Sequence, residues 1–160
     1  MKISPMRRLL TLVLLSLAVI SSCAQQTVKT RSDANNIFPK GNKINNANFK
    51  GTAYLKTLME ADSLNPTSVG NVTFEAGART RWHKHPGGQI LLVTDGVGYY
   101  QEQGQPKKIL RKGDVIKCPA NLPHWHGASE DTAFVQVAIT NRHLGETVWL
   151  HEVTEEEYKK

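Results

Sequence analysis

The stretch GARTRWHKHPGGQILLVTDG, residues 77–96, gives the strongest structural signal in this chain. His83 and His85 are separated by one residue, so on an extended segment their side chains point to the same face, about 7 Å apart along the backbone. Gln89 follows, and Gly77 and Gly96 bracket the group. Because one metal ion could bind both imidazoles, we expect the chemistry of the chain to lie here.

Short strands predominate from about residue 50 onward. Gly, Pro, Asn and Asp separate the apolar segments, and no segment before residue 150 has the long 3.6-residue apolar period of a helix. Regular short strands of this kind predict an all-β sandwich or a closed barrel. We predict strands at 52–59, 68–75, 89–94, 97–103, 107–110, 114–117, 132–139 and 147–151.

Two short motifs predict how segments begin and end. Asp95-Gly96 lies between two predicted strands and is typical of a tight hairpin. Thr154, followed three residues later by Glu157, is compatible with a capping box that opens a short C-terminal helical turn.

The predicted strands 89–94 and 132–139 are apolar on both faces. A small barrel needs only one apolar face per strand, so the second face indicates packing against another layer or another subunit. We therefore expect a homo-oligomer, either a dimer or a tetramer.

The first 22 residues have the pattern of an export signal. Three basic residues precede the apolar run 9–20, which is too short to span a bilayer comfortably. Cys23 directly follows two serines, which resembles a bacterial lipoprotein processing box where the cysteine becomes the acylated first residue. An ordinary signal peptide is the alternative, but the position of Cys23 favours the lipoprotein. Lipid chains would anchor the exported protein to a membrane, in the periplasm or at the cell surface.

Removal of the signal would leave 138 of the 160 residues, which suits one domain. The removed segment carries three of the 20 basic residues and none of the 14 acidic ones, so the net charge falls from +6 to +3. This balance gives no case for nucleic-acid binding. We divide the chain into a signal peptide at 1–22, a polar tether at 23–46, a barrel at 47–152 and a tail at 153–160.

Two further features have a plain structural interpretation. If Cys23 is acylated, Cys118 has no partner for an intrachain disulfide, and its place at an apolar strand end indicates packing. Arg79, Arg81 and Lys84 cluster near the histidines and could attract an anionic substrate, but a solvated strand edge is the simpler interpretation.

The spacings of two motifs resemble those of the cupin superfamily. The resemblance covers about residues 68–140 and implies a single cupin domain, a double-stranded β-helix or jelly-roll barrel. The matching residues are Gly77, His83, His85, Gln89 and Gly96 in the first motif, and Gly113, Pro119 and His124 in the second. Gln89 replaces the usual glutamate, Asn121 the usual glycine and Ala128 a common asparagine. Asn121 tolerates a left-handed backbone almost as glycine does.

This resemblance implies four metal ligands, which are His83, His85, Gln89 and His124. Neutral imidazoles suit Mn, Fe, Ni, Cu or Zn, and an amide oxygen adds a harder ligand. Because the set holds no carboxylate, a bound ion would keep its full 2+ charge. A lone histidine is more often packed without a metal, but three at family spacing favour a metal site.

A closer resemblance narrows the group. Residues 72–83 and 124–128 resemble small single-domain cupins with a His-His-Gln-His metal set, which include bacterial manganese-dependent hydroxynitrile lyases and carboxymuconolactone decarboxylase-associated cupins. It favours manganese and implies pocket positions at Gly70 and Val72. In the lyases a further histidine after the second motif is implicated as a base. Gln136 stands there in this chain, a possible pocket residue that cannot exchange a proton at ordinary pH.

His126 is the nearest spare base, two residues after His124 and therefore on the same side of an extended strand. It is a candidate catalytic residue, although a histidine that packs or orients a ligand is the interpretation we favour. Trp82 and Trp125 alternate with the ligands, so we expect them to face away and pack.

Three functions remain open at this point. The first is a metal-dependent, lyase-like enzyme that acts on a small oxygenated molecule through Lewis-acid activation, and we favour it. The second is a membrane-tethered cupin that binds a small ligand or metal without catalysis, for which Gln136 is the argument. The third is a structural barrel with a vestigial site, which the presence of all four candidate ligands disfavours.

Overall fold

The computed structural model describes residues 36–160. The predicted signal peptide at 1–22 and the predicted lipidation site at Cys23 lie outside the described residues. Within the described part, no helix is long and apolar enough to cross a bilayer.

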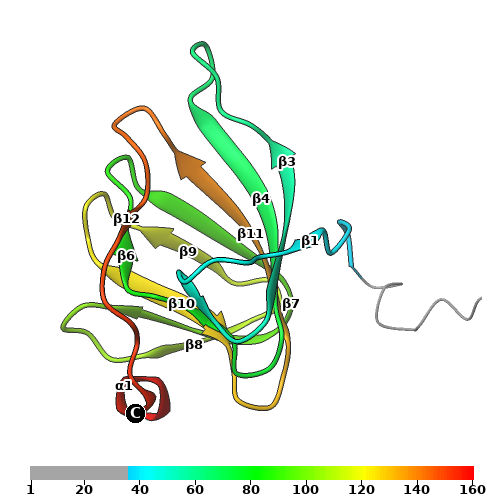
Figure 1. Cartoon of the computed structure of the whole chain (residues 1–160), viewed down its shortest axis with the longest axis vertical. Helices are drawn as coiled ribbons and strands as arrows, with labels where there is room; N and C mark the ends of the chain where they lie inside the picture. Colours follow the sequence, from blue (N-terminus) through cyan, green and yellow to red (C-terminus); the bar gives the residue numbers. More distant parts are fainter. Residues whose placement is uncertain (1–35) are drawn as a thin grey trace, which may run out of the picture. The chain divides into compact units, whose positions relative to one another are not determined.

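The described chain is almost entirely β-structure, which confirms the predicted all-β class (Figure 1). One short helix, α1 (Glu155–Lys159), follows the last strand. The strands are β1 (Asn42–Lys43), β2 (Phe49–Lys50), β3 (Ala53–Met59), β4 (Thr67–Phe74), β5 (Arg79–Thr80), β6 (His83–Lys84), β7 (Gln89–Glu102), β8 (Lys108–Arg111), β9 (Val115–Cys118), β10 (His124–Ala128), β11 (Phe134–Asn141) and β12 (Val148–Trp149).

Strand β7 connects the two sheets that enclose the interior. Its first half pairs with β11 and β9, in the sheet that continues through β4 and β3 to β1. Its second half pairs with β10 and β8, in the sheet that continues through β5 to β2 and also contains β6 and β12. All of these pairs are antiparallel, which is the arrangement expected of a jelly-roll barrel.

The hairpin predicted at Asp95-Gly96 is wrong, because β7 runs through this site without reversing. Asp95 pairs with Val135 and Val93 pairs with Gln136, so one extra residue bulges from β7 between these pairs. Gly96 adopts a φ of +77°, and a Cβ there would lie 1.9 Å from the carbonyl oxygen of Ala133. The extra residue is Thr94, and this bulge together with the left-handed backbone at Gly96 bends the strand, which lets β7 pass from one sheet to the other.

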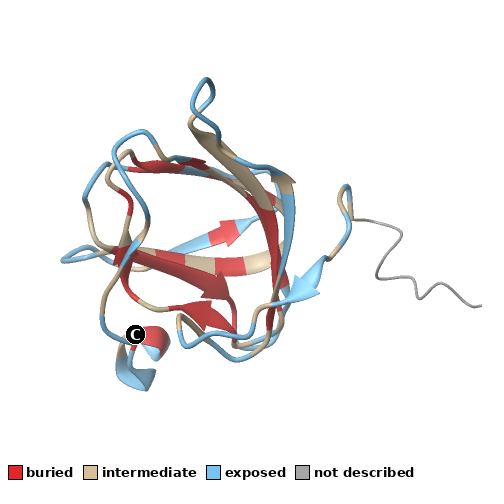
Figure 2. Ribbon diagram, turned by 45° about the horizontal axis from the view of Figure 1, so that its top comes forward, coloured by how far each residue is buried: buried red, intermediate tan, exposed pale blue. Residues whose placement is uncertain are grey.

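The interior of the barrel is apolar at one end and rich in histidine at the other. Phe74, Leu91, Tyr100 and Phe134 are fully buried and form the centre of the main core. Figure 2 shows the buried segments on the strands that surround this interior. Because these large side chains fill the space between the sheets, they fix the positions of the strands that carry the site residues.

The predicted capping box at the C-terminus is confirmed. The Thr154 hydroxyl accepts from the Glu157 amide and the Glu157 carboxylate accepts from the Thr154 amide, at 3.1 and 2.8 Å. The helix packs its buried Tyr158 against a second cluster with Trp82 and Trp125. Arg79 is buried and donates to the carboxylate of Glu155 at 2.8 Å, so it joins β5 to this helix.

Part of the segment that we expect to act as a tether lies on the barrel. Strand β1 pairs with β3, and the Asn71 side chain donates to the Pro39 carbonyl at 3.2 Å. Lys40 and Glu75 form an ion pair at 2.5 Å. The division of the chain at residues 22, 46 and 152 stays a prediction.

Candidate metal centre

Three buried histidines meet at one end of the barrel. His83 lies in β6 and His124 lies opposite it in β10, where the two are paired in register, and His85 directly follows β6. One ring nitrogen from each histidine lies within 4.8 Å of the others. The three side chains are 0–4% exposed. The spacing that predicted a shared site for these residues therefore corresponds to a compact cluster.

A hydrogen bond holds the outer nitrogen of each ring, and for His83 and His124 it also fixes the proton there. Nδ1 of His83 donates to the Arg81 carbonyl and Nδ1 of His124 donates to the Leu122 carbonyl, both at 2.9 Å. Nδ1 of His85 lies 3.2 Å from the Thr147 hydroxyl. A neutral imidazole that donates through Nδ1 keeps a lone pair on Nε2, and such outer partners are typical of metal-binding histidines.

Three buried polar atoms at this site have no hydrogen-bond partner among the described residues. They are Nε2 of His85, Nε2 of His124 and Oε1 of Gln89. The Gln89 amide nitrogen donates to the Thr140 hydroxyl at 2.9 Å, which leaves the amide oxygen free. A buried acceptor without a partner is costly, so a cation that several such acceptors share would relieve the cost. The residues present therefore fit a divalent metal.

Burial keeps the imidazoles neutral. Desolvation is the largest cause and holds the pKa of His83 well below its usual value, with further lowering from His124 and His126. Burial, followed by His124 and Arg142, lowers the pKa of His85 to about 3. Burial also lowers the pKa of His124. Because metals bind the unprotonated ring, these shifts leave the ligand atoms available at neutral pH.

His126 lies beside the three-histidine cluster with its Nδ1 bonded to Gln136. The Gln136 amide nitrogen lies 3.0 Å from this Nδ1, and Gln136 itself is fully buried. An amide nitrogen only donates, so the neutral His126 ring accepts at Nδ1 and carries its proton on Nε2. Burial holds the pKa of His126 well below its usual value. In its resting state His126 is therefore a neutral hydrogen-bond donor.

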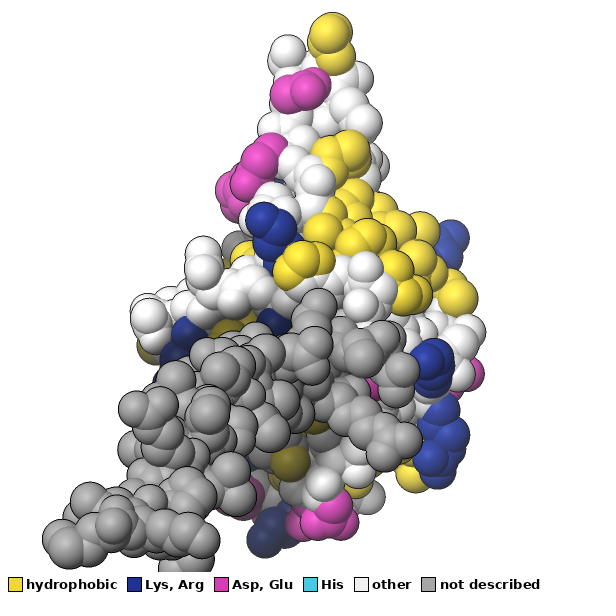
Figure 3. Space-filling model, turned by 90° about the vertical axis from the view of Figure 1, so that its right-hand side faces the viewer, with side chains coloured by type: hydrophobic (Ala, Val, Ile, Leu, Met, Phe, Trp, Pro, Cys, Tyr) yellow, Lys and Arg dark blue, Asp and Glu magenta, His cyan; other side chains and the backbone are white. Residues whose placement is uncertain are grey.

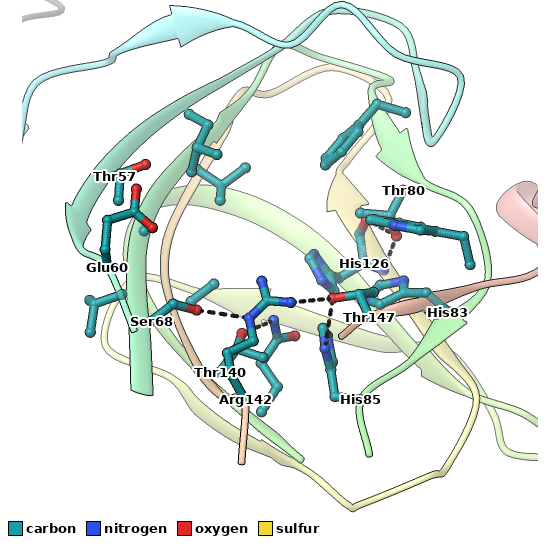
Figure 4. A pocket seen from close by; sticks show the side chains of 18 residues that line it. Thr57, Glu60, Ser68, Thr80, His83, His85, His126, Thr140, Arg142 and Thr147 are labelled. Carbon is teal, nitrogen blue, oxygen red and sulfur yellow. Dashed lines mark hydrogen bonds between the residues drawn. The ribbon is translucent and has the colours of Figure 1, made fainter. Parts of the chain in front are cut away.

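A cavity of about 230 Å³ opens onto the cluster (Figure 4). Gly70 and Val72, the predicted pocket positions, line it together with His126 and two of the candidate ligand histidines. Gln136, the third predicted pocket residue, is not among the residues that line it, but it is bonded to the lining residue His126. A cavity of this size suits a small organic molecule.

Several cavity residues could not be recognised from the sequence. Arg142 and Thr147 come from the loop between β11 and β12, and Trp149 stacks near His83 with ring centroids 4.9 Å apart. Thr140 orients Gln89 through its hydroxyl. None of these residues belongs to a recognisable motif, and the pairing of β12 with β6 is what brings this loop over the histidines.

The other residues singled out from the sequence have structural places. Trp82 and Trp125 face away from the cluster and pack around Tyr158, as expected. Asn121 has the left-handed backbone expected of it, with φ at +59°. Cys118 is buried and unpaired, and burial raises the pKa of its thiol to about 12.

Comparison with known proteins agrees with this geometry. The cupin domain family matches residues 70–140. An (R)-mandelonitrile lyase from Granulicella tundricola is 41% identical over 113 residues, which covers 70% of this chain and 86% of that protein. A cupin-like protein from Thermotoga maritima, known from a crystal structure, is 50% identical with a TM-score of 0.74, over 78% of this chain and 95% of its own.

A more distant structure supports the fold alone. A DMSP lyase from Ruegeria pomeroyi is 21% identical with a TM-score of 0.55, over 64% of this chain and 54% of its own. The same barrel therefore occurs in proteins whose sequences have diverged widely, and it does not by itself identify a reaction.

Proposed function

Because this chain belongs to the cupin superfamily, we propose that it is a metal-dependent, lyase-like enzyme that acts on a small oxygenated molecule. The observation that carries the proposal is the set of buried, unpartnered acceptors at the cavity, Nε2 of His85, Nε2 of His124 and Oε1 of Gln89. Similarity to a mandelonitrile lyase over 86% of that protein supports a lyase in particular.

In this proposal His83, His85, His124 and Gln89 hold the metal. When bound, a divalent ion supplies Lewis-acid activation of a substrate oxygen. Manganese is our first choice, since an amide oxygen among imidazoles favours a harder ion than a site with thiolates does; Fe, Ni, Zn and Cu also suit imidazole. Thr140 and Thr147 keep Gln89 and His85 in the orientation that ligation requires.

The other residues of the cavity bind and orient the substrate. Val72, Phe49 and Trp149 provide an apolar wall that excludes water. His126 presents a hydrogen-bond donor, because Gln136 occupies its Nδ1. A donor at this place would hold a negatively polarised substrate atom by a hydrogen bond, rather than remove a proton.

The experiment is mandelonitrile cleavage by the purified protein after metal removal and again after reloading with Mn. We expect benzaldehyde release that depends on Mn and that falls to background in His124→Ala. His143→Ala is the matched control, because His143 is exposed and outside the cavity. Metal-independent cleavage, or full activity in His124→Ala, would contradict the proposal.

A second candidate is a cupin that captures a small ligand without turnover. The Gln136–His126 pair favours it, because the donor amide removes the most obvious proton acceptor near the cavity. The two candidates separate if the Mn-loaded protein binds a mandelonitrile analogue but turns over no nitrile or hydroxy substrate. Turnover that disappears in His124→Ala would exclude the second candidate.

We also propose that the protein is an exported lipoprotein, anchored through Cys23 in the periplasm or at the cell surface. The support is the position of Cys23 directly after a signal-like apolar segment. Mass spectrometry of the N-terminal peptide tests this. An acylated Cys23 is expected, and a mature chain that begins elsewhere would contradict it.

A homo-oligomer through the outer face of the first sheet completes the proposal. The outward residues Ile90 and Val115 are 41% and 62% exposed. Leu92, on the same strand as Ile90, pairs with Val115, and Ile139 of β11 pairs with Ile90. Figure 3 shows hydrophobic side chains gathered on the side of the molecule that includes this sheet. Light scattering should give a dimer or tetramer that Ile90→Lys converts to a monomer, and a monomeric parent protein would contradict this.

A further inference from the structure

Arg142 lies at the cavity that the histidines share. It follows directly after β11, in the loop to β12, and lines the cavity with His85 and Thr147. Figure 4 shows its guanidinium between Ser68 and Thr147, next to the histidines. Among the described residues that line this cavity it is the one lysine or arginine.

Two nitrogens of the guanidinium are used to hold it in place. Nε donates to the Ser68 hydroxyl at 3.2 Å, which fixes it to β4. Nη1 donates to Glu146 at 2.5 Å and to the Thr147 hydroxyl at 3.3 Å. The side chain is 27% exposed, whereas that of Glu146 is 85% exposed. A partly buried cation is therefore held rigidly, while its carboxylate partner lies mostly in solvent.

The third nitrogen is available to a ligand. No hydrogen bond joins Nη2 of Arg142 to another of residues 36–160. The Thr147 hydroxyl links this guanidinium to His85, through contacts of 3.3 and 3.2 Å. One end of a small molecule could therefore reach Nη2 while its other end faces the histidine cluster.

The charges around the cavity favour an anion. The candidate ligands are neutral side chains, so they would not offset the 2+ charge of a bound ion. Arg142 adds a positive charge close to His85. Glu60 is the acidic residue that lines the cavity, and it lies exposed at the end of β3, on the opposite side from the histidines in Figure 4. Arginine is also the side chain best suited to a carboxylate.

We propose that Arg142 binds the carboxylate of a small hydroxy- or oxo-carboxylate substrate whose second oxygen faces the three-histidine site. This inference rests on the proposed function and names its substrate class. The sequence suggested Arg79 and Arg81 as residues that could attract an anionic substrate. Arg79 is instead bonded to Glu155, and neither arginine lines this cavity, so Arg142 takes that role in this inference.

Calorimetric binding of mandelate and mandelamide to the Mn-loaded full-length protein tests the proposal. The two probes share their hydroxyl and ring and differ in the carboxylate. We expect mandelate to bind at least about 10-fold more tightly, since a charge-assisted hydrogen bond accounts for about 10- to 100-fold in affinity. Arg142→Gln should remove this preference and leave mandelamide binding and metal content unchanged. Arg142→Lys should restore part of it.

Arg111→Gln is the control for net charge, because Arg111 is exposed on β8 and outside the cavity. It should keep the full preference for mandelate. Equal mandelate binding by the parent protein and Arg142→Gln would overturn the inference, as would an absence of mandelate binding by the parent. A loss of mandelamide binding in both Arg142 variants would also overturn it, because it would indicate a structural role.

Failure of the proposed function gives a different result. If the protein binds mandelate through Arg142 but cleaves no mandelonitrile, the carboxylate site is supported and the proposed lyase activity is contradicted. If the protein cleaves mandelonitrile with Mn but shows no Arg142-dependent preference for mandelate over mandelamide, the lyase activity is supported and the carboxylate site is contradicted.

Discussion

The proton positions on His83, His124 and His126 decide what this site can do. Backbone carbonyls hold the protons of His83 and His124 on Nδ1, which directs the Nε2 lone pairs inward. Gln136 does the reverse to His126, since its amide donates to Nδ1 and leaves the proton on Nε2. The rings of His83 and His124 are therefore arranged as acceptors and that of His126 as a donor.

Gln136→His should increase mandelonitrile cleavage. A histidine there could accept and release a proton through contact with His126, and a well-placed general base contributes about 10² or more to a rate. We expect kcat to rise by about 10²-fold in a steady-state assay with Mn. Gln136→Met removes the hydrogen bond without adding a base and serves as the control. A Gln136→His variant no faster than Gln136→Met would contradict this role.

Strand β7 is the element on which the barrel most depends, because it belongs to both sheets. Its bend at Gly96 combines a positive φ with close approach to Ala133, and both features exclude a side chain. Gly104 also has a positive φ, +81°, but a Cβ there would meet nothing within 4 Å. A side chain at Gly104 would therefore meet backbone strain alone, whereas a side chain at Gly96 would meet both strain and crowding.

Gly96→Ala should destabilise the protein far more than Gly104→Ala. A left-handed alanine costs about 1–2 kcal/mol, which both variants share. Gly96→Ala adds the displacement of a backbone carbonyl, so we expect a total of about 3 kcal/mol or more. Urea unfolding gives the two values. Equal losses would contradict the close approach of the Ala133 carbonyl to Gly96.

Most elements could be predicted from the sequence, and the main exceptions have physical reasons. Short apolar segments between turn residues located β3, β4, β9 and β11 within a few residues. Strands 79–80, 83–84 and 124–128 were not predicted, because their arginine and histidine side chains hide the alternation. The hairpin prediction failed at Asp95-Gly96 because a positive φ serves a bulge as well as a turn.

The candidate site divides in the same way. His83, His85 and His124 could be predicted because spacing along two strands places them on one face, and the structure brings them together. Arg142 and Thr147 could not, because their place depends on how the loop after β11 returns to pair with β6. Only tertiary structure relates that loop to the histidines.

At the scale of the molecule, a cluster of neutral histidines makes the stability of the metal-free protein depend on pH. Their pKa values are lowered in the folded state, to about 3 for His85, whereas in the unfolded chain they have the ordinary value of about 6.5. As the pH falls below 6.5, these histidines become protonated in the unfolded chain but stay neutral in the folded protein. Proton binding therefore favours the unfolded state, and the folded state loses stability.

We expect the free energy of unfolding of the metal-free protein to be flat between about pH 7 and 8 and to fall between pH 6.5 and 5. Each buried histidine contributes about 1.4 kcal/mol per pH unit well below 6.5. His85→Asn should reduce the slope by the share of one histidine, while His143→Ala should leave it unchanged. Identical slopes for the parent protein and His85→Asn would show that His85 is not held neutral.

Metal stoichiometry is the measurement on which the proposed function depends first. Elemental analysis of the purified protein, stripped and reloaded with Mn, should give about one ion per chain. His83→Ala combined with His124→Ala should give less than about a tenth of an ion, with His143→Ala unchanged. Substoichiometric metal in the parent protein with every divalent ion offered, or full loading in the double variant, would show that the three-histidine cluster is not a metal centre.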